Sequence, residues 1–167
     1  MSFDEIYRAY LDPIYGYCHR RLGTRHAAED ATQQVFTQAL AKLHTLRDQS
    51  PRGWLFTIAR NVTANVIRSW RPSSSLDAVF DVAAMDRSPE ELAIDAEQSA
   101  RVFAAMWRLT RDQREVIELR FSGVSVAETA RILRTSEGAV KQLQHRAVLK
   151  LRTSLGLDPT GKEHQDA

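Results

Sequence analysis

The sequence predicts an all-α protein made of two small helical domains joined by a flexible linker. Apolar residues recur at helical spacing through two basic stretches, which an acidic stretch separates. Residues 1–72 carry ten Lys and Arg against six Asp and Glu, residues 106–155 carry ten against five, and residues 73–100 hold seven acids and one arginine. We therefore expect four segments: a first domain over 1–72, a linker over 73–88, a second domain over 89–155 and a frayed tail over 156–167.

Three helices are expected in the first domain. Apolar spacing predicts one from Phe3 to about Leu22, with a kink or break at Asp12-Pro13. Thr24 can cap a second helix that runs to about Leu43. Ser50, followed by Pro51 in the first turn, can start a third helix that ends near Trp70.

The third helix separates apolar from polar side chains. Its apolar stripe is expected in the core together with Trp54, whereas Trp70 at the helix end is more open. The opposite side carries Arg60, Asn61, Asn65 and Arg68. Arginines with aromatic neighbours can hold single-stranded bases through charge and stacking, so this side is a candidate nucleic-acid surface.

The second domain contains a helix-turn-helix pattern. Helices are expected from Pro89 to about Leu109 and from Thr110 to Phe121. Ser125 can cap a short helix through Leu133, and Ser136 can cap a longer one to about Leu151. A short helix, a tight turn and a longer helix form the order that places a recognition helix in a DNA major groove.

The longer helix has one apolar and one polar face. Its apolar face is predicted to point into the core, and its polar face holds Lys141, Gln142, His145 and Arg146. No acid occurs between Glu137 and Asp158. These residue types suit phosphate neutralisation and hydrogen bonding to base edges. For one helix alone a solvated charged face is the simpler interpretation, but two capped helices at this spacing favour DNA binding.

Several other classes of protein are disfavoured. Cys18 is the sole cysteine, so no intramolecular disulfide can form, and a reducing cytosol is the expected compartment. Cys18-His19 lacks the second pair that a zinc site needs, so we expect a buried thiol, no metal and no cofactor. No apolar run is long enough for membrane insertion. No catalytic motif is found, so the chain is predicted not to be an enzyme.

The motifs together resemble the two conserved domains of bacterial sigma factors, in the extracytoplasmic-function (ECF) group of the sigma-70 class. Residues 28–36 are similar to the helix of sigma domain two that binds core RNA polymerase, and residues 54–61 to the promoter-melting segment. Residues 109–121, 126–133 and 137–141 resemble sigma domain four. They occur in the family's order.

The resemblance implies roles for individual positions. Core-polymerase binding falls on Asp30, Gln33, Gln34 and Phe36. The loop before the third helix would capture a flipped base of the minus-ten element, beside the polar side of that helix. The resulting minus-ten set is Leu46, Arg47, Arg60, Asn61, Asn65 and Arg68. The set that reads the minus-thirty-five element is Arg134, Lys141, Gln142, His145 and Arg146.

The function implied is that of an alternative sigma factor, which binds core RNA polymerase and directs promoter recognition and melting. Its partners would be core RNA polymerase, promoter DNA and an anti-sigma factor, in the cytoplasm. The alternative is a helix-turn-helix regulator that acts without polymerase, but residues 1–72 lack the strand pattern of a receiver or ligand domain. A sigma mimic that does not bind promoters is disfavoured by the intact basic faces. We expect no fixed interface between the two domains.

Overall fold

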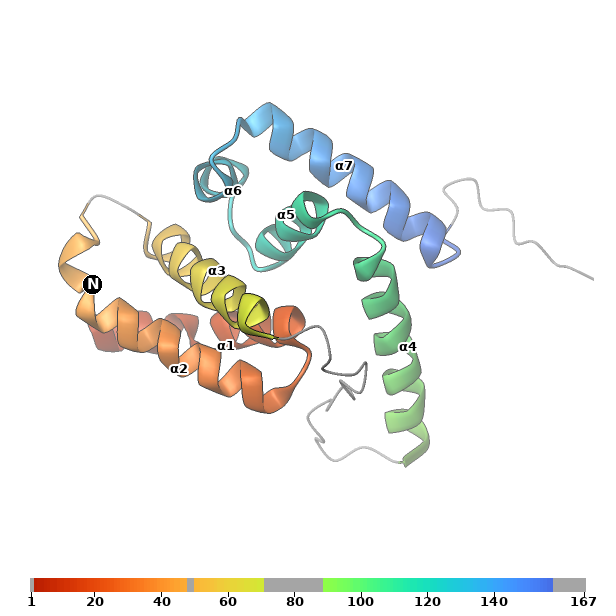
Figure 1. The fold of residues 1–167 in the computed structure, drawn as a ribbon, viewed down its shortest axis with the longest axis horizontal. Coiled ribbons are helices and arrows are strands. Elements are labelled where there is room, and N and C mark those ends of the chain that lie inside the picture. The colour runs from red at the N-terminus through yellow and green to blue at the C-terminus, as the bar shows by residue number, and fades with distance from the viewer. Residues whose placement is uncertain (1, 48–49, 71–88, 158–167) are drawn as a thin grey trace, which may run out of the picture.

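The computed structural model describes residues 2–47, 50–70 and 89–157, except the side chains of 89–96. Within these ranges the chain consists of helices and connecting turns and contains no strand, which confirms the all-α prediction (Figure 1). The predictions of a flexible linker over 73–88 and of a frayed tail fall almost wholly outside the described residues.

The first domain contains the three expected helices, α1 (Phe3–Leu22), α2 (Arg25–Ala41) and α3 (Pro51–Ser69), and a short 3₁₀ helix η1 (Leu43–Thr45) after α2. The α1 helix is continuous through Pro13, so the predicted break is wrong. Each α-helix begins after a residue whose side-chain hydroxyl accepts a hydrogen bond from the backbone N–H three residues later. These capping residues are Ser2, Thr24 and Ser50. Local capping therefore defines where these helices start.

The core of the first domain lies between its three helices. The rings of Tyr17 on α1 and Phe56 on α3 meet edge to face, with centroids 5.4 Å apart. Trp54 is buried as predicted, and its indole Nε1 donates to Thr45 Oγ1 at 3.1 Å. Trp70 is exposed. This core fixes the polar side of α3 relative to α2.

The second domain consists of α4 (Pro89–Trp107), α5 (Arg111–Phe121), α6 (Val126–Leu133) and α7 (Glu137–Ser154). Reciprocal capping boxes start α5 and α6, at Thr110 and Ser125. Arg134 ends α6 in the left-handed conformation, with φ 54°, and so makes the tight turn into α7. The predicted helix-turn-helix is confirmed.

The recognition helix α7 is held in place by both apolar packing and a side-chain clamp. A small cluster joins three of the helices through Val116, Ala130 and Val140. Arg120 on α5 donates from Nε to Gln144 Oε1 at 3.2 Å and from Nη1 to the Val124 carbonyl at 2.6 Å. One guanidinium therefore ties α7 and the loop before α6 to the end of α5.

The two domains pack against each other, and the expectation of no fixed interface is wrong for this structure. Helices α5 and α6 lie against α1 and α3 (Figure 1). Leu119, Val124 and Ile132 of the second domain belong to the same hydrophobic cluster as the core of the first. Burying them needs the other domain, which gives the interface its apolar component.

Candidate polymerase-binding and nucleic-acid-binding sites

The exposed side of α2 carries three of the four residues predicted to bind polymerase. Asp30, Gln33 and Gln34 are exposed. The Asp30 carboxylate lies 3.4 Å from Nε2 of His26, one helical turn earlier. Because none of the three is held by the core, their side chains are available to a partner.

Phe36, the fourth predicted docking residue, lies in the core instead. Its side chain is only 5% exposed, and its ring meets Tyr7 edge to face at a centroid distance of 4.8 Å. A second edge contact reaches Phe3 at 6.5 Å. Phe36 follows Val35 of the buried stripe by one position, and α1 covers it. This packing is a fold contact, and a contact of Phe36 with polymerase stays a prediction.

The polar face of α7 is exposed as predicted. The four residues Lys141, Gln142, His145 and Arg146 all lie on the surface, while Val140 and Ala147 on the other side are fully buried. Arg134, at the turn that precedes α7, is also exposed. A cationic and amide-bearing face of this kind can contact both phosphates and base edges.

Most of the minus-ten set lies on the surface of the first domain. Asn61, Asn65 and Arg68 are exposed along α3, where Arg68 donates to Asn65 Oδ1 and, at 3.3 Å, to the Ala64 carbonyl. Arg47 is exposed after η1, and Leu46 is half-buried against the core. The exposed members can reach a bound strand without unfolding the domain.

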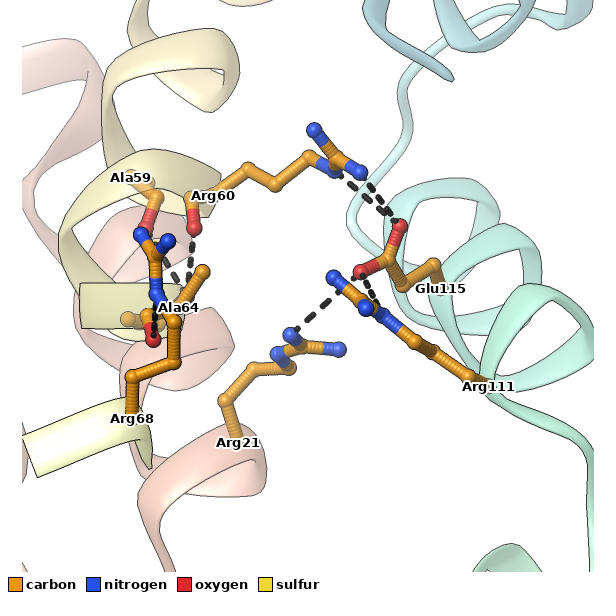
Figure 2. A network of polar contacts seen from close by, with 8 residues as sticks. Arg21, Ala59, Arg60, Ala64, Arg68, Arg111 and Glu115 are labelled. Atoms are coloured by element: carbon orange, nitrogen blue, oxygen red, sulfur yellow. Dashed lines mark hydrogen bonds and ion pairs between the residues drawn. The ribbon is translucent and has the colours of Figure 1, made fainter. Parts of the chain in front are cut away.

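Arg60 differs from the rest of the minus-ten set because an acid of the other domain engages it (Figure 2). Its Nε and Nη2 lie 3.0 and 2.9 Å from Oε2 of Glu115 on α5. The other carboxylate oxygen of Glu115 has Arg21 at 3.7 Å and Arg111 at 3.6 Å. Arg60 therefore lies on the polar side of α3, as predicted, but it is paired with the second domain.

A second ionic cluster lies beside the first. Arg20 Nε contacts Glu118 Oε2 at 2.8 Å, and Arg20 Nη2 donates to Ser122 Oγ at 2.7 Å. The Arg20 guanidinium also lies over the Phe121 ring, 4.7 Å from its centroid. Arg52 of α3 donates to the Ser122 carbonyl at 2.6 Å. This cluster was not predicted from the sequence, where its signal is a pair of acids about one turn apart on α5, Glu115 and Glu118.

Two grooves follow the seam between the domains. The larger, of about 1130 Å³, is lined by α1, α3, α4 and α5 and includes Asn61 and Arg68. The smaller, of about 450 Å³, lies between α3 and α6, and it brings Arg60 and Asn61 of the minus-ten set together with Arg134 of the minus-thirty-five set. Residues predicted for two separate promoter elements thus share one seam.

Glu128 adds a polar contact at this seam. Burial would raise the pKa of its carboxyl, but hydrogen bonds with Ser50 of the first domain and with Ser125 outweigh burial, and the pKa lies below its ordinary value. The Cβ position of Gly53 lies 3.2 Å from the same carboxylate, so a side chain there would press on it. The start of α3 and the start of α6 are therefore closely apposed.

Other kinds of site were sought in the described part of the chain. It contains no group of three or more His, Cys, Asp or Glu residues placed to hold a metal ion. Burial raises the pKa of the Cys18 thiol to about 11, against a weaker opposing effect of a hydrogen bond with Thr32, so the thiol is a poor nucleophile. None of the described helices has the length and apolar character needed to cross a membrane.

Comparisons with known proteins agree with this architecture. Residues 6–71 match the family described as sigma-70 region 2, and residues 105–153 match sigma-70, region 4. The ECF RNA polymerase sigma factor BldN of Streptomyces coelicolor is 38% identical over 155 residues, which cover 90% of this chain and 59% of BldN. SigX of Bacillus subtilis, also an ECF sigma factor, is 34% identical over 164 residues, which cover 93% of this chain and 84% of SigX.

Solved structures show the same fold. The sigma factor RpoE in complex with the anti-sigma factor NepR, from Bartonella quintana, has a TM-score of 0.70 at 23% identity, covering 93% of this chain and 98% of RpoE. The structure of CnrH in complex with the cytosolic domain of CnrY has a TM-score of 0.71 at 23% identity, and the match covers 93% of this chain and 88% of the chain in that structure. With both regions present in order, and with SigX matched over most of its length, the chain belongs to the ECF RNA polymerase sigma factors.

Proposed function

We propose that this chain acts as a promoter-specificity subunit of RNA polymerase, with its tasks divided between the domains. The proposal rests on one observation: exposed polar faces of DNA-binding type occur on two separate helices, α3 and α7, in different domains. A regulator that only binds duplex DNA needs one such face. A factor that both finds and opens a promoter needs two, because duplex and single-stranded DNA present different groups.

The second domain would read duplex DNA at the minus-thirty-five element. Lys141 and Arg146 can neutralise phosphate or meet guanine, and Gln142 and His145 can hydrogen-bond to base edges. The side-chain clamp of Arg120 on Gln144 holds α7 at a fixed angle to the rest of the domain. Preorganisation of this kind lowers the entropy cost of docking a helix in the groove.

The first domain would capture the minus-ten element after its bases unstack. Extruding a base costs a few kcal/mol, so capture of one or two bases can seed opening without ATP. The groups we assign to this capture are Leu46 and Arg47 after η1 and, on the polar side of α3, Arg60, Asn61, Asn65 and Arg68. We assign no catalytic residue to the chain, since nucleotide joining would be the work of the polymerase.

Docking on core polymerase would use the exposed side of α2, with Asp30, Gln33 and Gln34 but without the side chain of Phe36. The RpoE and CnrH structures are complexes with NepR, an anti-sigma factor, and with the cytosolic domain of CnrY. We infer an anti-sigma partner for this chain as well. Its place of action would be the cytoplasm, together with the polymerase.

Reconstituted transcription tests the proposal. Purified chain is added to core polymerase, and run-off transcripts are scored on a library of genomic fragments. We expect initiation from a subset of promoters, and loss of complex formation for Asp30→Ala. Glu29→Ala is the matched control, because Glu29 is also an exposed acid of α2 with a partner one turn earlier on its own helix, and it has no assigned docking role. A chain that binds duplex DNA selectively but does not bind core polymerase would instead support the helix-turn-helix regulator.

A further inference from the structure

The two buried acids of α5 form their ion pairs mainly with the other domain, although Oε1 of Glu115 accepts no hydrogen bond. The side chains of Glu115 and Glu118 are 3% and 5% exposed. A carboxylate taken out of water needs ion pairs or hydrogen bonds to offset its lost hydration. Of the guanidinium groups within ion-pair distance of the two acids in the described residues, Arg20, Arg21 and Arg60 belong to the first domain, and Arg111 lies on α5 itself. The burial of the two acids therefore depends on guanidinium groups of the first domain, and both carboxylates would return to water if the domains separated.

Closure uses a group that the proposed DNA complex also needs. Both Nε and Nη2 of Arg60 are directed at Glu115 Oε2, so the guanidinium face that could meet a phosphate is already occupied by a carboxylate. Nearby, Ile132 of α6 and Arg134 at the end of that helix line the same smaller groove as Asn61. A DNA strand lying along this part of α3 would have to displace the second domain.

We propose that Glu115 and Glu118, paired with Arg20, Arg21 and Arg60, form an autoinhibitory latch that closes the second domain over the strand-capturing side of α3. The proposal rests on the minus-ten role given to Arg60 above. Docking on polymerase then has two effects, since it holds the domains apart and releases Arg60 for DNA. Free chain does not capture single strands at its full affinity.

The chemistry of the latch suits a reversible contact. Opening returns two carboxylates and several guanidinium groups to water, and this regained hydration offsets much of the lost ion pairing. Opening also exposes Leu119, Val124 and Ile132 to water, and the cost of exposing these apolar side chains favours the closed state. The affinity of the free chain for a strand is reduced by the fraction of open molecules, so a chain that is about one-tenth open binds about tenfold more weakly than an open one.

Charge reversal at the Arg20–Glu118 pair tests closure, because neither residue belongs to the proposed polymerase or DNA surfaces. Fluorophores at Ala41→Cys on α2 and Lys150→Cys on α7 report the distance between the domains by energy transfer, since both positions are exposed. Cys18 is buried and stays unlabelled. We expect Arg20→Glu and Glu118→Arg to lengthen the distance, and the double exchange to restore it.

Strand binding is measured with the same variants. The probe is a fluorescent single-stranded oligonucleotide that carries the non-template minus-ten sequence of a promoter found in the transcription screen. Each single variant should bind it about tenfold more tightly than the unmodified chain, and the double exchange should bind as the unmodified chain does. Arg20→Glu is the sharper case, because it adds negative charge and would weaken DNA binding if the latch were absent. Asp112→Arg, which changes an exposed acid of α5 outside the latch, controls for added positive charge.

Each result decides the proposal. Single variants that leave the distance unchanged, or that lengthen it without tightening strand binding, would overturn it. Glu115→Gln keeps the side-chain shape and provides a second opening variant if a charge reversal unfolds the chain, with helical content checked by circular dichroism. Experiments in the polymerase complex distinguish a failure of the proposed function from a failure of the latch. There, Arg60→Ala without effect on promoter opening would remove Arg60 from minus-ten capture, while the distance measurement would still report the latch.

Discussion

Replacing Phe36 by alanine separates a core role from a docking role at the position where sequence and structure disagree. The ring is 5% exposed and makes edge contacts with Tyr7 and Phe3. Truncating a buried phenylalanine costs about 3–5 kcal/mol, from lost burial and from the cavity left behind. Tyr7 is partly exposed and can move into the space, so we expect a loss near the lower end, about 3 kcal/mol.

Urea unfolding followed by far-ultraviolet circular dichroism measures this loss. A change of about 3 kcal/mol is a large share of the 5–15 kcal/mol that typically holds a domain together, so the midpoint should fall clearly. Phe36→Leu is the matched variant, because it keeps an apolar side chain of similar volume and should cost less than about 1.5 kcal/mol. It should also retain its affinity for core polymerase.

Two results would refute the assignment to the core. One is an unchanged unfolding midpoint for Phe36→Ala together with a lost affinity for polymerase. The other is a Phe36→Leu variant that is stable but no longer docks. Either would mean that the ring acts at the polymerase surface, and that the packing against Tyr7 opens on binding.

Three other predictions follow from single residues. Asp30→Ala should change the free energy of unfolding by no more than about 0.5 kcal/mol, since Asp30 is exposed, yet lower the affinity for core polymerase; a collapse of thermal stability would make Asp30 structural. Arg146→Ala should weaken duplex minus-thirty-five binding by about 1–3 kcal/mol and relax selectivity at one position while pre-melted promoters still open, whereas an even loss across sequences would indicate phosphate contact alone. Burial raises the pKa of Tyr17 from 10.0 to about 12. The neutral hydroxyl therefore adds about 3 kcal/mol to the free energy of unfolding, a contribution that is complete below pH 10 and is lost as the pH rises to 12. Unfolding measured across that range should show the loss, and Tyr17→Phe, which cannot ionise at this position, should remove that part of the pH dependence.

Helix positions could be predicted because their causes are local. The hydroxyls of Thr24, Ser50 and Ser125 each cap a helix three residues from their bonding partner, so a short stretch of sequence contains the whole interaction. The apolar face of α7 was likewise readable, since Val140 and Ala147 recur at helical spacing. The polar face of α7 followed as the complement of this stripe, whereas the docking residues of α2 came from the resemblance to sigma factors.

The exceptions depend on what a helix meets in space. Phe36 lies about 100° around the helix from Val35, at the border of the buried stripe, and its burial is decided by the rings that α1 brings over it. Arg60 lies on the polar side of α3, as predicted, but its partner is 55 residues away. Periodicity separates polar from apolar faces and contains no information on which polar faces meet.

The contact between Arg60 and Glu115 also explains why closure and DNA capture compete. A carboxylate and a phosphate both offer anionic oxygens to a guanidinium, so one arginine can serve the second domain or the DNA backbone with similar geometry. The two contacts differ in their response to salt. Glu115 is buried and its ion pairs are screened weakly, whereas binding to a strand releases counterions and weakens steeply as salt rises. Raising the salt concentration should therefore shift the free chain toward closure relative to strand binding, and the gain in affinity given by opening variants should persist while all affinities fall.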